Sequence, residues 1–151
     1  MAIRSVVQEG DEVLRQICFP VENFDGKLHE LLNDMKDTVK KEDGAGLAAP
    51  QVGVLRRVVV IDVPEGYFEM INPVILGVKG EQRGYEGCLS VRGKRGVVSR
   101  PMKVKVAFYD RNGEKHVMQT KGLFARAVCH ELDHLDGVLY IDRAEYLERA
   151  D

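Results

Sequence analysis

The sequence has no tryptophan, only three cysteines and five prolines, and no apolar run long enough to cross a bilayer. Three cysteines argue against a disulfide framework and are typical of a reducing compartment, so we expect a cytoplasmic protein. A formal charge of −2 gives no electrostatic reason to expect nucleic acid or an anionic membrane as a partner. Residues 1–15 become polar and acidic too soon for a secretory signal or a transit peptide.

What remains is ordinary globular composition, with 44% hydrophobic and 30% charged residues. A chain of this length buries roughly 70% of its extended surface, which is enough for one core. The sequence contains no repeat, low-complexity tract or linker, although residues 77–96 are rich in glycine. We therefore expect one domain over residues 1–151.

Two helical patterns enclose a set of short strands. Apolar residues recur every three or four positions over residues 27–41 and again over residues 123–136, and Gly137 follows the second pattern. Asn112-Gly113 predicts a hairpin, and Pro73 predicts a sheet edge or a bulge. The expected strands cover residues 58–61, 68–75, 102–109 and 115–119. This order favours an α+β fold, in which small, mostly antiparallel sheets pack around the C-terminal helix and an amphipathic helix lies near the N-terminus.

The C-terminal helix carries the motif HExxH as His130-Glu131-Leu132-Asp133-His134. At about 100° per residue, the two imidazoles lie one turn apart on nearly the same face, so both can reach one cation. Glu131 flanks this pair and can reach a metal-bound water without being a ligand, as a general base must. The alternative is a solvated helix with incidental histidines.

A catalytic metal site of this type needs a third protein ligand and an open position. No downstream residue has a suitable spacing, and His29 and His116 lie in patterns that indicate structural roles. Cys88 is the strongest upstream candidate, because a thiolate binds zinc or ferrous iron well. Cys18 and Cys129 are instead expected to be small buried hydrophobic residues.

The helical wheel separates two apolar faces of the C-terminal helix. One face is the core stripe, formed by Phe124, Val128, Leu132 and Leu135. Leu123 and Ala127 fall near the direction of His130, where they suit a substrate with a hydrophobic side chain, although packing in the core is an equally simple role for Leu123.

Three segments together resemble the peptide deformylase family. The first is Gly44-Ala45-Gly46-Leu47-Ala48-Ala49-Pro50-Gln51, which is similar to the family motif GxGLAAxQ. The second and third are Glu86-Gly87-Cys88-Leu89-Ser90, similar to EGCLS, and residues 130–135, similar to HExDHL. Their order and separations also match, and the resemblance covers nearly the whole chain.

The resemblance implies a role for each matching residue. Cys88, His130 and His134 would hold one divalent metal, with water in the fourth position, and Glu131 would be the acid and base. The Gln51 amide and the Leu89 backbone N–H would stabilise the oxyanion. The substrate peptide would pair with the backbone near Gly46 and Gly87, and the implied substrate-binding residues are Gly44, Ala45, Gly46, Glu86, Gly87, Leu123 and Ala127. Glu86 would pair with Arg100.

The implied reaction is removal of the formyl group from N-formylmethionyl peptides of nascent chains, by attack of a metal-bound hydroxide. The resemblance favours Fe²⁺, although zinc, nickel or cobalt would also suit this ligand set in the purified protein. Because the sequence ends soon after the catalytic helix, we do not expect the docking on the ribosome that some bacterial members achieve with a longer basic helix. Two alternatives from the residues alone are a zinc endopeptidase and a structural metal module closed by a fourth ligand.

Overall fold

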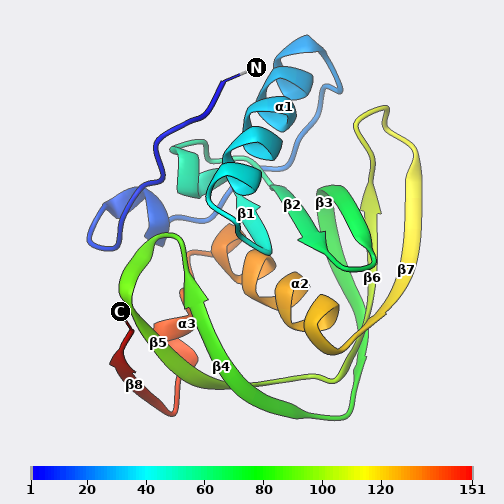
Figure 1. Cartoon of the computed structure of the whole chain (residues 1–151). Helices are drawn as coiled ribbons and strands as arrows, with labels where there is room; N and C mark the ends of the chain where they lie inside the picture. Colours follow the sequence, from blue (N-terminus) through cyan, green and yellow to red (C-terminus); the bar gives the residue numbers. More distant parts are fainter. Residues whose placement is uncertain (1, 151) are drawn as a thin grey trace.

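The computed structural model describes residues 2–150, and its elements follow one another from the N-terminal α1 to the C-terminal β8 (Figure 1). The α-helices are α1 (Gly26–Lys41), α2 (Gly122–Leu135) and the short α3 (Tyr140–Arg143), and two 3₁₀ turns are η1 (Glu12–Arg15) and η2 (Ala49–Val52). The strands are β1 (Gly46–Ala48), β2 (Val58–Val63), β3 (Gly66–Lys79), β4 (Gln82–Cys88), β5 (Val91–Arg100), β6 (Lys103–Tyr109), β7 (Lys115–Lys121) and β8 (Tyr146–Arg149). The predicted α+β class is confirmed.

The larger sheet has the strand order β1-β2-β3-β6-β7, and each of its pairs is antiparallel. Helix α1 packs on it through a fully apolar stripe, formed by Leu28, Leu31, Leu32, Met35 and Val39. Asp25 caps this helix, because its side chain accepts a hydrogen bond from the N–H of Leu28. The predicted irregularity at Pro73 is also present, since the register between β3 and β6 shifts between Ile71 and Val74.

The smaller sheet has the order β4-β5-β8, again antiparallel, and none of these strands was expected from the sequence. Their residues include the glycine-rich stretch, where strand propensity is low. Gly96 shows why β5 contains glycine. A Cβ at that position would lie 2.7 Å from Leu147 Cδ2 and 2.9 Å from the Tyr146 carbonyl oxygen, so the close approach of β8 to β5 requires its absence.

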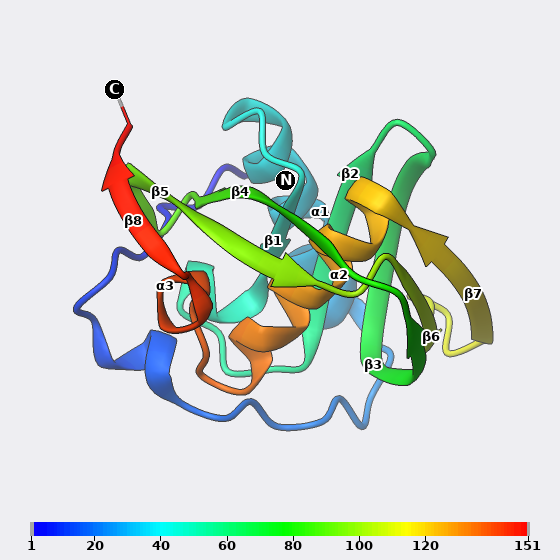
Figure 2. The ribbon, with the colours of Figure 1, turned by 90° about the horizontal axis from the view of Figure 1, so that it is seen from below.

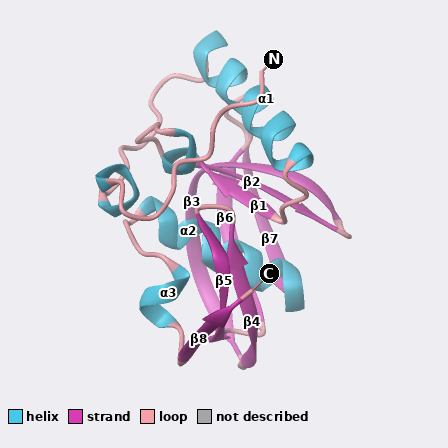
Figure 3. Ribbon diagram, turned by 60° about the vertical axis from the view of Figure 1, so that its left-hand side comes forward, coloured by secondary structure: helices cyan, strands magenta, loops and turns pink. Residues whose placement is uncertain are grey.

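Helix α2 lies between the two sheets, with β4 and β5 on one side and β2 and β3 on the other (Figures 2 and 3). The predicted core stripe of this helix is buried, and it packs with residues of β2, β3 and β6. Because both faces of α2 are covered by sheets, residues on the face away from the core stripe point toward β1 and β4. This face carries the HExxH motif.

The N-terminal segment crosses the molecule before α1 begins. The N–H of Ala2 and the guanidinium of Arg4 both bind Asp34 on α1, and the N–H of Arg4 binds Thr38. Within residues 2–150, no helix is long and apolar enough to cross a membrane.

Candidate active site

Three ligand atoms from two elements meet beside α2. The helix places His130 and His134 on one face, and the end of β4 brings Cys88 to them. The Cys88 Sγ atom lies 3.4 Å from His134 Nε2, and one ligand atom from each of the three residues lies within 4.8 Å of the others. One thiolate and two imidazoles are a donor set that suits zinc or ferrous iron. The three predicted metal ligands are therefore brought together.

Glu86, two residues before Cys88, orients His130. Its Oε1 accepts a hydrogen bond of 2.9 Å from His130 Nδ1, which leaves Nε2 as the ring nitrogen available to a metal. Arg100 donates two bonds of 2.9 Å to the same carboxylate, so the predicted pair is present and bidentate. Burial would raise the pKa of Glu86, but the hydrogen bonds from Arg100 and His130 outweigh it and hold that pKa well below its ordinary value. The side chain is thus a fixed anion, and only its main chain is left for a substrate.

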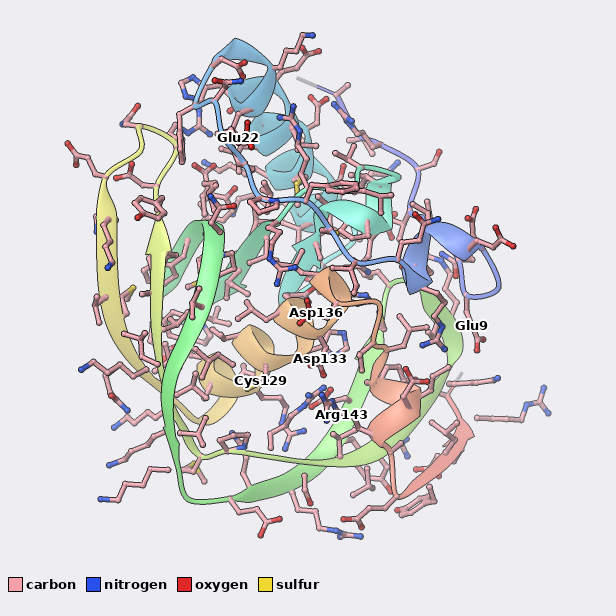
Figure 4. All side chains as sticks on the ribbon, turned by 180° about the vertical axis from the view of Figure 1, so that it is seen from behind. Glu9, Glu22, Cys129, Asp133, Asp136 and Arg143 are labelled. Atoms are coloured by element: carbon pink, nitrogen blue, oxygen red, sulfur yellow. The ribbon has the colours of Figure 1, made fainter. Side chains whose placement is uncertain are left out.

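A chain of ion pairs extends from this carboxylate. Arg126, four residues before His130 on α2, donates a bond of 2.6 Å to Glu86 Oε2. On the other side, Arg100 donates to Asp133 at 2.8 Å, and Arg143 of α3 donates to Asp133 at 2.7 Å. Figure 4, which views the molecule from behind, shows Asp133 and Arg143 close together. Asp133 therefore supports the arginine that holds Glu86.

Glu131 is buried beside the histidines, with 5% of its surface exposed. Its Oε1 has no hydrogen-bond partner among the described residues, and its Oε2 would collide with any Cβ at Gly46 of β1. Burial raises the pKa of Glu131 to about 7, and the nearby His130 opposes this increase. An unpartnered carboxyl group that exchanges a proton near neutral pH fits an acid–base role.

Gln51 lies fully buried in η2 and faces the turn that follows β4. Its Oε1 accepts a bond of 2.9 Å from the N–H of Ala48, so the amide orientation is fixed. Its Nε2 donates to Ser90 Oγ at 3.0 Å and lies 3.6 Å from Cys88 Sγ. The amide NH₂ group thus points to Cys88 and Ser90, the two residues that flank Leu89.

A cavity of about 340 Å³ connects these groups. It is lined by every residue predicted to bind substrate: Gly44, Ala45, Gly46, Glu86, Gly87, Leu123 and Ala127. Leu123 is 53% exposed, so packing in the core is the wrong alternative for it, whereas Ala127 is buried in the cavity wall. β1 and β4 are both outermost strands of their sheets and both line the cavity, so an extended peptide could pair with them.

The other histidines and cysteines lie outside this site. His29 bonds the Arg111 carbonyl oxygen, and His116 bonds Asp110 in the β6–β7 hairpin, as structural residues do. Cys18 and Cys129 are buried, and burial raises the pKa of both thiols, to about 11 for Cys18. Both thiols are therefore protonated at neutral pH.

Two residues of the site were not anticipated. Ser90, which is fully buried, orients the Gln51 amide, and Arg126 supports Glu86. Arg126 did leave a signal in the sequence, because an arginine among the apolar residues of a buried helix needs a carboxylate partner. The hydroxyl of Ser90 left none, since serine is common in turns.

An HExxH helix, a thiolate ligand from a neighbouring strand and a buried free carboxylate in an apolar cavity together define a metal-dependent hydrolase. The family model described as polypeptide deformylase matches residues 3–150. The chain therefore belongs to the polypeptide deformylase family, whose members remove the N-terminal formyl group from nascent peptides.

Individual relatives agree with this assignment. A peptide deformylase of Thermoanaerobacter pseudethanolicus is 54% identical over 144 residues, which are 95% of this chain and 91% of the relative. The crystal structure of peptide deformylase from Thermotoga maritima matches with a TM-score of 0.94 at 38% identity, covering 97% of this chain and 100% of that one. A peptide deformylase from Synechococcus elongatus, solved in complex with actinonin, matches with a TM-score of 0.90 at 41% identity, covering 93% of this chain and 78% of the other.

Proposed function

We propose that residues 1–151 form one catalytic domain that hydrolyses the N-formyl group of N-formylmethionyl peptides, with the residue roles given below. The observation that carries this proposal is the convergence of Cys88, His130 and His134 within 4.8 Å, next to the unpartnered carboxylate of Glu131. A structural metal module would need a fourth protein ligand, and the described residues place no further cysteine, histidine or carboxylate within the group.

The three ligands would hold one divalent ion, which we propose to be Fe²⁺. When bound, the ion supplies a Lewis acid that lowers the pKa of the attacking water and polarises the formyl carbonyl. The protein's part is to keep the ligands in place. Glu86 fixes the tautomer of His130, and Arg100 and Arg126 neutralise and hold Glu86.

Glu131 would take the proton of the attacking water and return it to the leaving amine. A pKa near neutrality allows the same carboxyl group to perform both transfers. The Gln51 amide and the Leu89 N–H would bind the oxygen that becomes negative during attack. Removing one such donor typically costs about 3 kcal/mol of transition-state stabilisation, or roughly 10²–10³-fold in turnover.

The peptide would lie between β1 and β4, with its backbone paired to residues 44–46 on one side and to the main chain of Glu86 and Gly87 on the other. Leu123 and Ala127 would contact the methionine side chain beside the scissile bond. The structure from Synechococcus elongatus contains actinonin, and we propose that actinonin binds this cavity too.

The substrate identifies the cellular setting that we propose. N-formylmethionyl chains are nascent polypeptides, so the enzyme would act in the cytoplasm on chains at the ribosome. Recognition would rest on the extended end of the chain, and no contact with the ribosome itself is needed for the chemistry.

The direct test is an assay of the anaerobically purified, iron-loaded protein on formyl-Met-Ala-Ser, with formate release as the readout. Acetyl-Met-Ala-Ser and an internally quenched peptide serve as controls for amide and endopeptidase activity. We expect turnover of the formyl peptide alone, with one iron per chain and inhibition by actinonin. Cleavage of the quenched peptide would instead support an endopeptidase, and a metal that binds without any hydrolysis would support a structural module.

A further inference from the structure

Residues Val7–Glu9, here called the strap, contact both turns that carry the proposed oxyanion donors. The N–H of Val7 donates a hydrogen bond of 2.7 Å to the Gln51 carbonyl oxygen. The Gln8 side chain donates a bond of 3.0 Å to the Leu89 carbonyl oxygen, and the N–H of Glu9 donates a bond of 2.7 Å to the Ser90 carbonyl oxygen. Three consecutive residues therefore bind three carbonyl groups of the site.

These bonds close a ring of three segments that are far apart in the sequence. The strap binds η2 through the main chain of Gln51, and the Gln51 side chain binds Ser90 Oγ at 3.0 Å. The turn after β4 then returns to the strap through Leu89 and Ser90. Figure 4 shows Glu9 beside the hairpin between β4 and β5. The distance between the Gln51 turn and the Leu89 turn is thus set by the strap and by Ser90 together.

The strap is itself fixed at both ends. Before it, Arg4 is paired with Asp34 of α1. After it, the N–H of Asp11 binds the Gln8 carbonyl oxygen, and η1 follows with the buried side chain of Leu14. A segment held on both sides can transmit a defined position to the groups that it binds, whereas a frayed terminus cannot.

We propose that the strap is a positioning element for the oxyanion donors, and that Gln8 is its positioning residue. The inference rests on the proposed roles of Gln51 and Leu89. Gln8 touches no reacting atom. Its bond to the Leu89 carbonyl oxygen holds the peptide plane between Leu89 and Ser90. The donating N–H of Leu89 belongs to the preceding plane, between Cys88 and Leu89. Rotation of the Leu89–Ser90 plane changes the direction of the Cys88–Leu89 plane, so the loss of the Gln8 bond misdirects the N–H of Leu89.

The test is the variant Gln8→Met, which keeps the length of the side chain and removes its donor. The matched control is Gln16→Met, because Gln16 is an exposed glutamine of the same N-terminal segment whose side chain makes no hydrogen bond to the described residues. The substitution removes the bond to Leu89 and also a bond of 3.1 Å from the Gln8 amide to the Val6 carbonyl oxygen, which lies outside the site. We expect kcat of Gln8→Met to fall roughly threefold to tenfold, the effect of losing the bond to Leu89, with KM and iron content unchanged. Gln8→Lys restores a donor of similar reach and should regain most of the turnover.

A merely structural role of Gln8 would lower the melting temperature or the iron content and leave kcat per bound iron unchanged. That outcome, or an equal kcat for Gln8→Met and Gln16→Met, overturns the inference. Two further measurements separate this failure from failure of the proposed function. If the wild-type protein releases no formate, the function is wrong, and if Gln51→Ala turns over normally, the oxyanion assignment is wrong.

Discussion

Gly46→Ala is the sharpest test of the proposed acid–base role, because it displaces Glu131 without changing it. A Cβ at Gly46 would lie 2.7 Å from Glu131 Oε2, 2.8 Å from its Cγ and 3.0 Å from its Cδ. The backbone of Gly46 is not in the left-handed region, so alanine itself is tolerated there. The collision with one side chain is thus the main consequence of the added methyl group.

The expected magnitude follows from the confinement of that side chain. Only 5% of the surface of Glu131 is exposed, and α2 is enclosed between two sheets. The 2.7 Å separation must therefore grow to an ordinary contact of 3.4–4 Å by rotation or displacement of the carboxyl group, a change of roughly 1 Å. A displacement of about 1 Å in a catalytic group costs on the order of 10²-fold in rate. Overpacking of the core costs about 1–3 kcal/mol of stability. We therefore expect kcat to fall about a hundredfold while the protein stays folded.

The assay is formate release from formyl-Met-Ala-Ser, together with iron content and the melting temperature. The control is Gly77→Ala in β3, where the added Cβ meets no atom within 4 Å and the backbone is again outside the left-handed region. Iron content should stay at one per chain in both variants, because the collision involves no ligand. The reasoning is refuted if Gly46→Ala turns over as fast as Gly77→Ala.

Further predictions concern the ligands and their supports. Glu131→Gln should abolish turnover and keep stoichiometric iron, and loss of metal with residual activity would contradict its role as the base. Cys88→Ala should lose both iron and activity, because it removes the thiolate, and a variant with full metal content would show that the upstream ligand is wrong. Glu86→Gln should weaken metal binding roughly 10–100-fold, as measured by competition with a chelator, because His130 loses its charged partner. Gly96→Ala should lower the free energy of unfolding by about 1–3 kcal/mol in urea titrations, because its Cβ would collide with Leu147 of β8, and unchanged stability would show that β8 adjusts freely.

The parts of the fold that could be predicted are those with strong local periodicity. Helix α1 was expected at residues 27–41 and covers Gly26–Lys41, because its stripe of apolar residues needs no distant partner to be recognised. Helix α2 was equally clear. The second sheet could not be foreseen, since β4 and β5 contain glycines whose value lies in the close approach of other elements, such as Leu147 against Gly96.

The residues of the candidate site could likewise be predicted only in part. The HExxH spacing places two ligands on one helix face by geometry alone. Cys88 was the strongest upstream candidate for the third ligand from its chemistry, and the resemblance of the EGCLS segment then assigned it to the metal. The ring through Val7, Gln51 and Ser90 is a product of tertiary structure. Two of its bonds come from backbone N–H groups, which every residue except proline carries, so no side-chain pattern could reveal them.

The position of β1 and β4 as the outermost strands of their sheets has a consequence for the order of events in a cell. An enzyme that takes its peptide as an added strand holds it mainly through hydrogen bonds to the main chain. It also needs a terminus that is still extended, because a terminus already folded into a helix or a sheet has no free backbone groups to offer. On this proposal, deformylation competes with the folding of each new protein, and fast-folding N-terminal elements would leave the shortest time for it.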